Sequence, residues 1–240
     1  MSFEIIYETG EDGNVHWLYH QEVETMRSTG LTARTQPSHD AIRLLRRGLI
    51  TDEEDFPPDP RYIQNGKTYA NLTRIDFWYP VIADLTMPTM FCEKLDNEAA
   101  SILRDVGWQR CFVKNSVKSL VEECPLESVW PDVSFEVMRE KFSVNPRKGP
   151  YALRQYLPAK HFIEERRYWV IGEKVHHSSG CIPKIVFEVM ERLASFSGVF
   201  YTIDATPELI VEINGGESSD RKTDNKAEDF AAWIKHAFSL

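Results

Sequence analysis

Three polar motifs in the second half of the chain hold residue types that bind metal ions and phosphates. The last of them is Ile203–Asn214 (IDATPELIVEIN), which predicts two strands around a Thr-Pro-Glu turn. Such a hairpin brings Asp204 near Glu212, and it puts Asn214 on the same face as Glu212. Two carboxylates and one amide are ligands that suit Mg²⁺, which takes its other ligands from water and nucleotide phosphates. The alternative is that Asp204 and Glu212 point to opposite sides and are hydrated.

The first motif, Phe112–Lys118 (FVKNSVK), places two lysines four residues apart. Lys114 ends an apolar strand, where an ammonium group is unfavourable unless an anion meets it. If the chain turns helically after Asn115, Lys114 and Lys118 can converge on one phosphate chain. Taken alone, the motif fits two lysines on a solvated turn better.

The second motif, Glu164–Gly172 (EERRYWVIG), has the composition of a strand. Alternation places Glu165 and Arg167 on one face of it. A carboxylate can hold a sugar hydroxyl while the guanidinium fork matches phosphate oxygens. Taken alone, this motif fits an ordinary ion pair on a solvent-facing strand better.

The elements that position these motifs become well defined after residue 95. The pattern predicts helices over Asp96–Val106, Ser134–Phe142, Pro183–Phe196 and Ala227–Phe238. It predicts strands over Gln109–Lys114 and Tyr151–Leu157, and hairpins of Glu165–Ile171 with Lys174–His177 and of Val199–Asp204 with Leu209–Asn214. This order is typical of a mixed α+β fold with antiparallel hairpins, and it argues against a doubly wound parallel sheet.

The first half is rich in loops, and its elements are less clear. Asp40–Ile50 predicts a short amphipathic helix, while Phe3–Tyr7, Val15–Tyr19 and Ile75–Tyr79 are the candidate strands. Because the composition changes near residue 95, we expect an N-terminal domain over 1–95 and a second domain over 96–240.

Composition restricts the class of protein. The 240 residues are 42% hydrophobic, and the formal net charge is −9 with no run rich in Lys or Arg. A nonspecific grip on nucleic acid and a basic membrane-surface helix are therefore not expected. No stretch has the length and apolar character of a membrane span or signal peptide, so we expect a cytoplasmic protein. The spacing of the four cysteines predicts reduced thiols rather than a disulfide framework.

Taken together, the motifs resemble the ATP-grasp superfamily over Phe112–Asn214. In that family a strand lysine is followed by an apolar hinge strand, an acid-x-Arg hairpin, a helix, and a hairpin with Asp and Glu-x-Asn. The resemblance implies two α+β subdomains that grip ATP, preceded by a smaller α/β N-terminal domain on the substrate side. One departure is that Asn115–Leu120 lacks the usual glycine-rich loop. A branch marked by two lysines and one arginine resembles this chain better, and it matches Lys114, Lys118 and Arg167.

The resemblance implies phosphate contacts for the three cations. Lys114 would contact the α- and β-phosphates of ATP, and Arg167 the terminal phosphates. Lys118 would replace the amides of the missing loop, so Lys118 and Arg167 would be the catalytic cations.

For the rest of the nucleotide, the resemblance implies base and sugar contacts. The backbone of Gln155, Tyr156 and Leu157 would read adenine. Glu165 would hold the ribose hydroxyls.

The resemblance also implies a metal and a reaction. Asp204, Glu212 and Asn214 would bind Mg²⁺, and the chain would join a carboxylate to an amine through an acylphosphate. The substrates would be small molecules or peptides. An ATP-dependent phosphotransferase and a nucleotide-binding module without catalysis are the alternatives, and the sequence does not indicate an oligomeric state.

Two further segments have weaker chemistry. Gly215–Arg221 follows the metal motif directly, so its glycines would let the backbone approach a ligand and Arg221 would bind a substrate carboxylate. A flexible connector explains this segment equally well. His176, His177 and Cys181 have a spacing compatible with zinc, but the sequence offers no fourth ligand.

Overall fold

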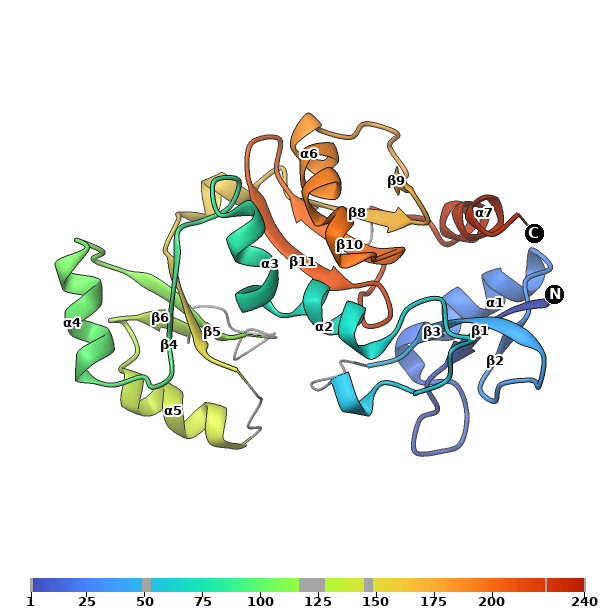
Figure 1. The fold of residues 1–240 in the computed structure, drawn as a ribbon, viewed down its shortest axis with the longest axis horizontal. Coiled ribbons are helices and arrows are strands. Elements are labelled where there is room, and N and C mark those ends of the chain that lie inside the picture. The colour runs from blue at the N-terminus through green and yellow to red at the C-terminus, as the bar shows by residue number, and fades with distance from the viewer. Residues whose placement is uncertain (1, 49–52, 117–127, 145–148, 223, 240) are drawn as a thin grey trace.

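The computed structural model of the chain describes residues 2–48, 53–116, 128–144, 149–222 and 224–239. Within them, three sheets follow one another along the longest axis of the molecule (Figure 1). We call them the N-terminal sheet, the central sheet and the outer sheet. The N-terminal and outer sheets lie at opposite ends, and both chain ends lie beside the N-terminal sheet.

The N-terminal sheet is parallel, as expected of a small α/β unit. Its strands, in spatial order, are β2 (Ala33–Arg34), β1 (Ser2–Tyr7) and β3 (Ala41–Arg46). The prediction of a strand over Phe3–Tyr7 is confirmed by β1. The short helix η1 (Trp17–Tyr19) and helix α1 (His20–Ser28) connect β1 to β2, and η2 (Glu53–Asp55) follows β3.

The helix predicted over Asp40–Ile50 is wrong, because Ala41–Arg46 forms strand β3. Both faces of this strand are buried, including the side chains of Arg43 and Arg46. Glu4 and Glu22 neutralise these two arginines, at 3.2 and 2.8 Å. Tertiary ion pairs thus allow a strand whose sequence has a helical spacing.

Two predicted strands are helical instead. Val15–Tyr19 forms one isolated bridge at Val15 and then η1. Ile75–Tyr79 lies within α3 (Ile75–Ile82), where Ile75, Trp78 and Ile82 are fully buried at the helical spacing of three and four residues. Local β propensity is overridden here by burial of a helical face.

The outer sheet is antiparallel, and its elements confirm the pattern predicted after residue 95. Its strands, in spatial order, are β4 (Thr89–Cys92), β7 (Tyr151–Gln155), β5 (Cys111–Asn115) and β6 (Val129–Trp130). Helices α4 (Asn97–Asp105) and α5 (Phe135–Val144) belong to the same lobe. Asp96 caps α4 by accepting from the amides of Glu98 and Ala99, and Gly107 follows it with φ +75°. Since β4 pairs with β7, this sheet includes residues before position 95.

The central sheet contains both predicted hairpins. Its strands, in spatial order, are β11 (Ile210–Gly215), β10 (Phe200–Ala205), β8 (Arg166–Ile171) and β9 (Lys174–His176), all antiparallel. The helix predicted over Pro183–Phe196 is α6 (Lys184–Arg192), continued by η5 (Leu193–Phe196). The residue that follows, Ser197, has a left-handed backbone with φ +56°.

The two faces of the central sheet pack against different elements. On one face, Tyr168 and Ile203 share a core with Trp78 of α3 and Val189 of α6. Helix α2 (Gly66–Thr73) also contributes to that core. On the other face, Trp169 and the rest of a second core contact α7 (Ala227–Ala237) and the N-terminal sheet. This second face is apolar at the end near α7 and polar at the other end.

Two further findings on the described residues concern membrane spans and cysteines. No helix among the described residues has both the length and the apolar character that a bilayer span requires. Cys92, Cys111 and Cys181 are free thiols, while Cys124 lies outside the described residues.

Candidate active site

Three charged residues lie side by side on the polar part of the central sheet. Arg167 of β8 lies opposite Asp204 of β10, which in turn lies opposite Glu212 of β11. Residues opposite each other on antiparallel strands share a face, with Cβ atoms about 5 Å apart. The predicted approach of Asp204 to Glu212 is therefore confirmed, and the alternative with the two carboxylates on opposite sides is wrong.

Two buried cations contact these carboxylates. The guanidinium of Arg167 donates from Nε to Oδ1 of Asp204 at 2.7 Å and from Nη2 to Oδ2 at 2.6 Å. Lys114 extends from β5 of the outer sheet and donates to Oε1 of Glu212. Because Lys114 and Arg167 are buried, each needs an anion beside it. The solvated-turn interpretation of Lys114 is therefore wrong.

These contacts fix the charges of the site. Burial opposes the charge of Arg167, but the carboxylates of Asp204 and Asp220 raise its pKa above the ordinary value. Burial also raises the pKa of Glu212, but the ammonium of Lys114 and a hydrogen bond from Asn214 lower it to about 2. Glu212 is thus ionised at neutral pH, as a metal ligand must be.

The donor atoms of this site fit a magnesium ion. Asp204 and Glu212 offer two adjacent carboxylates, and Asn214 offers an amide on the same face of β11. Oxygen ligands of this kind suit Mg²⁺, which retains several waters. Within the described ranges, no three His, Cys, Asp or Glu side chains are grouped so that they could hold a metal ion.

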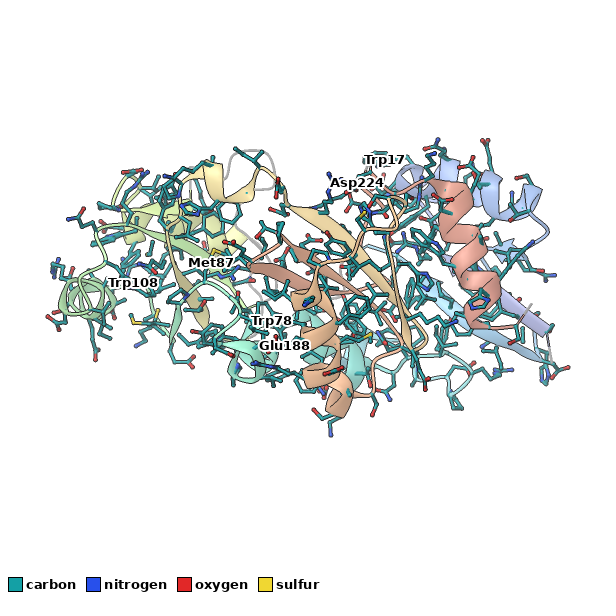
Figure 2. The ribbon with its side chains drawn as sticks, turned by 90° about the horizontal axis from the view of Figure 1, so that it is seen from above. Trp17, Trp78, Met87, Trp108, Glu188 and Asp224 are labelled. Atoms are coloured by element: carbon teal, nitrogen blue, oxygen red, sulfur yellow. The ribbon has the colours of Figure 1, made fainter. Side chains whose placement is uncertain are left out.

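A cavity of about 420 Å³ lies where the outer and central sheets meet. Met87, labelled in Figure 2, lies in its wall. This volume is in the range of small-molecule sites. Six of the residues predicted to bind ATP or magnesium line it: Lys114, Gln155, Tyr156, Leu157, Glu165 and Glu212. Residues from both sheets therefore converge on one cavity.

The predicted hinge has fewer free amides than its sequence suggests. The amide of Gln155 donates to the carbonyl of Pro88 at 2.9 Å, and that of Tyr156 donates to the carbonyl of Arg110 at 3.3 Å. A nucleobase in the cavity would have to be read by carbonyl oxygens of this segment or by the amide of Leu157.

Lys118, the second lysine of the first motif, lies outside the described residues. Its predicted role in phosphate binding and catalysis stays a prediction.

The same cavity contains a buried cation that was not predicted from the sequence. Arg154 of β7 lies in the cavity wall and is 4% exposed. Its Nη1 donates to the carbonyl of Val211 at 2.8 Å, and its Nη2 donates to Oγ1 of Thr86 at 2.9 Å. Burial lowers the pKa of Arg154 to about 10. The signal in the sequence was the alternation of YALRQYL, which puts Arg154 on the face of Ala152 and Tyr156.

Two more missed residues belong to the segment after β11. Asp220 accepts from Nη1 of Arg167 with its carbonyl, at 3.0 Å, and with its carboxylate. The ammonium of Lys222 lies 2.9 Å from Oε1 of Glu165 and 3.3 Å from Oδ2 of Asp204. The polar run ESSDRKTDNK gives no local signal for these contacts, because they depend on how the chain returns over the sheet.

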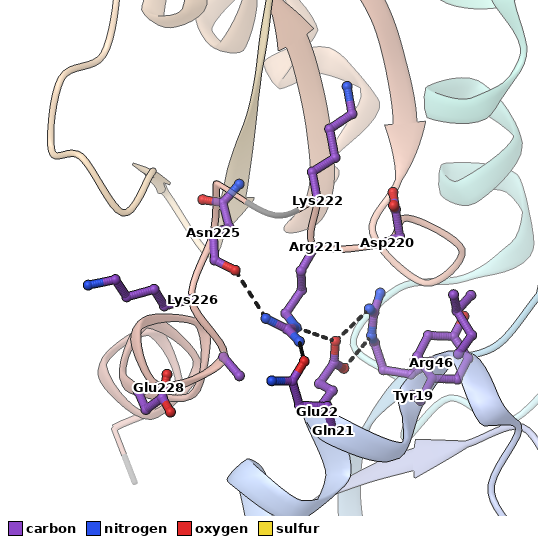
Figure 3. A pocket seen from close by; sticks show the side chains of 12 residues that line it. Tyr19, Gln21, Glu22, Arg46, Asp220, Arg221, Lys222, Asn225, Lys226 and Glu228 are labelled. Atoms are coloured by element: carbon purple, nitrogen blue, oxygen red, sulfur yellow. Dashed lines mark hydrogen bonds and ion pairs between the residues drawn. The ribbon is translucent and has the colours of Figure 1, made fainter.

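Arg221 lies in a second cavity, of about 480 Å³, between α1, the end of β3 and the start of α7 (Figure 3). Glu22 accepts from Nε and Nη2 of Arg46 at 2.8 and 2.9 Å, and it lies 3.3 Å from Nε of Arg221. Nη1 of Arg221 donates to the carbonyl of Asn225 at 3.0 Å. Asp220 and Lys222 also line this cavity, so it adjoins the row of Arg167 and Asp204.

The glycines of Gly215–Arg221 have a different role from the one expected. A Cβ at Gly215 would lie 2.5 Å from the ring of Tyr69, and one at Gly216 would lie 2.7 Å from the ring of Phe200. The glycines therefore let the chain approach aromatic side chains of the protein, not a ligand.

The residues considered for zinc have other partners. His177 contacts Oγ of Ser179 with Nδ1 at 2.7 Å and the carboxylate of Asp224 with Nε2 at 3.1 Å. His176 stacks on Trp233 with ring centroids 5.2 Å apart.

The whole chain is similar in fold to solved ATP-grasp proteins, although no protein-family model and no curated protein matches its sequence. A RimK-domain ATP-grasp protein from Sphaerobacter thermophilus superposes with a TM-score of 0.63 at 13% identity, over 99% of each chain. The ATP-grasp ligase PsnB, in a complex with a minimal precursor, Mg and ADP, gives 0.56 at 11% identity over 98% of each chain. The macrocyclase MdnC of Microcystis aeruginosa, bound to the precursor peptide MdnA, gives 0.55 at 10% identity over 98% of this chain and 99% of MdnC. At these identities the likeness is one of fold.

Proposed function

Because the chain has the ATP-grasp fold, we propose that it is an ATP- and Mg²⁺-dependent ligase that joins a carboxylate to an amine through an acylphosphate. The observation that carries this proposal is the single cavity in which Lys114, Glu165 and Glu212 meet the segment 155–157. Lys114 and Gln155 belong to the outer sheet and Glu212 to the central sheet, while Glu165 directly precedes β8. A cavity with this combination of cations, carboxylates and apolar wall suits a nucleotide.

The proposed chemistry depends on positioning and on charge. An oxygen of the substrate carboxylate attacks the γ-phosphorus of ATP, the bond to the β-phosphate oxygen breaks, and ADP leaves. The amine nitrogen then attacks the acyl carbon, loses a proton, and phosphate leaves. Magnesium, when bound, would neutralise phosphate oxygens during the transfer.

In this mechanism the side chains of the chain act as ligands and orienting groups. Asp204, Glu212 and Asn214 would hold the metal, and Lys114 and Arg167 would exchange their carboxylate partners for phosphate oxygens. Because both cations are already buried and oriented, the phosphates would meet preorganised charges.

We place the carboxylate substrate in the second cavity, between residues 1–95 and the segment after β11. Arg221 lines this cavity, where its guanidinium contacts Glu22, Gln21 and the carbonyl of Asn225. A substrate carboxylate bound in bidentate fashion would replace two of these partners.

Asp220 and Lys222 separate the second cavity from Arg167 and Asp204, so a carboxylate there would lie near the cation proposed to hold the terminal phosphate. The N-terminal sheet, within 1–95, would then form the substrate side, while 96–240 would supply most of the nucleotide site together with β4 and α3, which pack with the outer and central sheets.

A peptide is the substrate class that the comparisons favour. PsnB is complexed with a precursor, and MdnC is bound to the precursor peptide MdnA. By analogy of fold, the carboxylate or the amine here would belong to a peptide.

The test is ADP release from Mg·ATP with pools of carboxylates, amines and peptides, coupled to measurement of product mass. A ligase needs both substrates for ADP release, and its product gains the sum of their masses minus water. ADP release with one acceptor and a gain of one phosphate would instead identify a phosphotransferase. Nucleotide binding without turnover in any pool would identify a non-catalytic module.

A further inference from the structure

The segment after β11 contacts the row of charged residues on the central sheet, Arg167, Asp204 and Glu212, at several points. Arg167 donates to both the carbonyl and the carboxylate of Asp220, and the side chain of Asn225 donates to the carbonyl of Arg167 at 3.0 Å. Between these two anchors, the ammonium of Lys222 contacts Glu165 at 2.9 Å and Asp204 at 3.3 Å. The segment therefore brings one more cation to Glu165, which lines the 420 Å³ cavity, and to Asp204, which lies opposite Glu212 of the same cavity.

The backbone of Lys222 is in an unfavourable conformation. Its φ is +49°, in the left-handed region that residues other than glycine, asparagine and aspartate rarely adopt. Such a conformation persists only where the surroundings enforce it, and it is common at functional sites. Glycine would be the favourable residue if position 222 served the turn alone.

The direction of the side chain follows from this backbone. Arg221 extends toward Glu22 and the second cavity, whereas Lys222 extends away from Arg221 toward the central sheet (Figure 3). The left-handed residue thus sends two consecutive cations in opposite directions, one toward each of two adjoining sites.

Asp204 does not need Lys222 for its own neutralisation. Arg167 already gives it two hydrogen bonds with near-ideal distances. A magnesium–ATP complex, with about two net negative charges, would add anionic oxygens to a row that already holds several carboxylates. An ammonium on a flexible four-carbon stem can move from a carboxylate to such an oxygen while its backbone stays fixed.

We propose that Lys222 is a phosphate-binding residue of this site, an inference that rests on the proposed function. The segment after β11 would thereby supply a third cation, in addition to Lys114 and Arg167. In this structure the ammonium of Lys222 contacts Glu165 and Asp204. In the nucleotide complex it contacts a phosphate oxygen from the side of the second cavity.

The experiment measures binding of Mg²⁺ with a nonhydrolysable ATP analogue, and of Mg·ADP, by calorimetry. Lys222→Ala should weaken binding of the triphosphate analogue about tenfold or more, the usual effect of losing a bond to a charged group. The loss for Mg·ADP should be smaller, because the diphosphate is less negative. Lys184→Ala is the matched control, since Lys184 is exposed at the start of α6 against the opposite face of the sheet, and its affinities should equal those of wild type.

Lys222→Gly separates the function of the side chain from the shape of the turn. It should show the same loss of affinity as Lys222→Ala. Its midpoint of thermal unfolding should be higher than that of Lys222→Ala, because glycine adopts φ +49° without strain. Unchanged or tighter binding of the triphosphate analogue by both variants would overturn the proposal, since tighter binding means that Lys222 only competes with the ligand. If wild type binds neither nucleotide, the proposed function fails first and this inference with it.

Discussion

Lys114 and Glu212 form an ion pair across the junction of two sheets, although 98 positions separate them in the chain. Lys114 belongs to the outer sheet and Glu212 to the central sheet, so the contact joins the two walls of the 420 Å³ cavity. Each residue lies in a motif that predicts phosphate or metal binding. The pair therefore supports a site in which the two residues separate when a nucleotide binds. Lys114 would then contact phosphate oxygens, and Glu212 would contact the metal ion.

Glu212→Gln should strongly reduce ATP turnover, most of all at low magnesium, because it removes one of two anions from the metal site. The glutamine carbonyl can still accept from Lys114, but the buried ammonium loses its anion, so we expect a folded variant with a lower midpoint of thermal unfolding. Turnover as a function of magnesium concentration checks this, with Glu208→Gln in the exposed turn of the same hairpin as the control. Wild-type turnover of Glu212→Gln at low magnesium would remove Glu212 from the metal site.

Lys114→Ala should weaken binding of a nonhydrolysable ATP analogue by about 1.5–3 kcal/mol, the usual worth of a hydrogen bond to a charged group. Calorimetry measures this affinity, and thermal unfolding shows that the variant is folded. Lys94→Ala, an exposed lysine in the same lobe, is the control with an equal change of charge. An affinity equal to wild type would leave Lys114 as a structural partner of Glu212 only.

Arg221→Ala should raise the KM for the carboxylate substrate with little change in ATP affinity, as expected when ground-state binding is removed. Arg221→Lys should give an intermediate KM, because lysine keeps the charge but loses the bidentate fork. Steady-state kinetics with the carboxylate varied and ATP saturating provide the test. If both variants match wild type, the second cavity is not the carboxylate site.

Glu217→Gln should stabilise the protein at alkaline pH. Burial raises the pKa of Glu217 to about 8, although Arg46 and a hydrogen bond from Gln64 oppose that shift. The folded protein therefore holds this proton more tightly than the unfolded chain, whose glutamate has a pKa near 4.3. The stability that this proton contributes is complete below about pH 4, and it is lost as pH rises toward 8, by up to about 1.4 kcal/mol per pH unit.

Denaturant unfolding of wild type and Glu217→Gln between pH 5 and 9 measures the difference. The two curves should diverge with rising pH, with the variant more stable. Glu228→Gln, at an exposed position of α7, is the control and should follow wild type. Parallel curves for Glu217→Gln and wild type would mean that Glu217 is ionised in the folded protein at neutral pH.

The sequence alone was sufficient to predict those elements whose structure depends mainly on residues close together in the chain. The alternation of IDATPELIVEIN placed Asp204 with Glu212, because a strand repeats every two residues. Glu165, expected to share a strand face with Arg167, instead precedes β8. Helix α4 could likewise be predicted from the sequence, because Asp96 is a favourable N-cap residue at its start.

Only the tertiary structure decided the parts that depend on contacts between distant residues. Ala41–Arg46 became a strand because Glu4 and Glu22, far away in the chain, neutralise its buried arginines. Lys222 reached Glu165 and Asp204 only because the segment after β11 folds back over the sheet. No periodicity encodes such a contact, since the free energy that selects it comes from burying and pairing charges that meet only after the sheets have assembled.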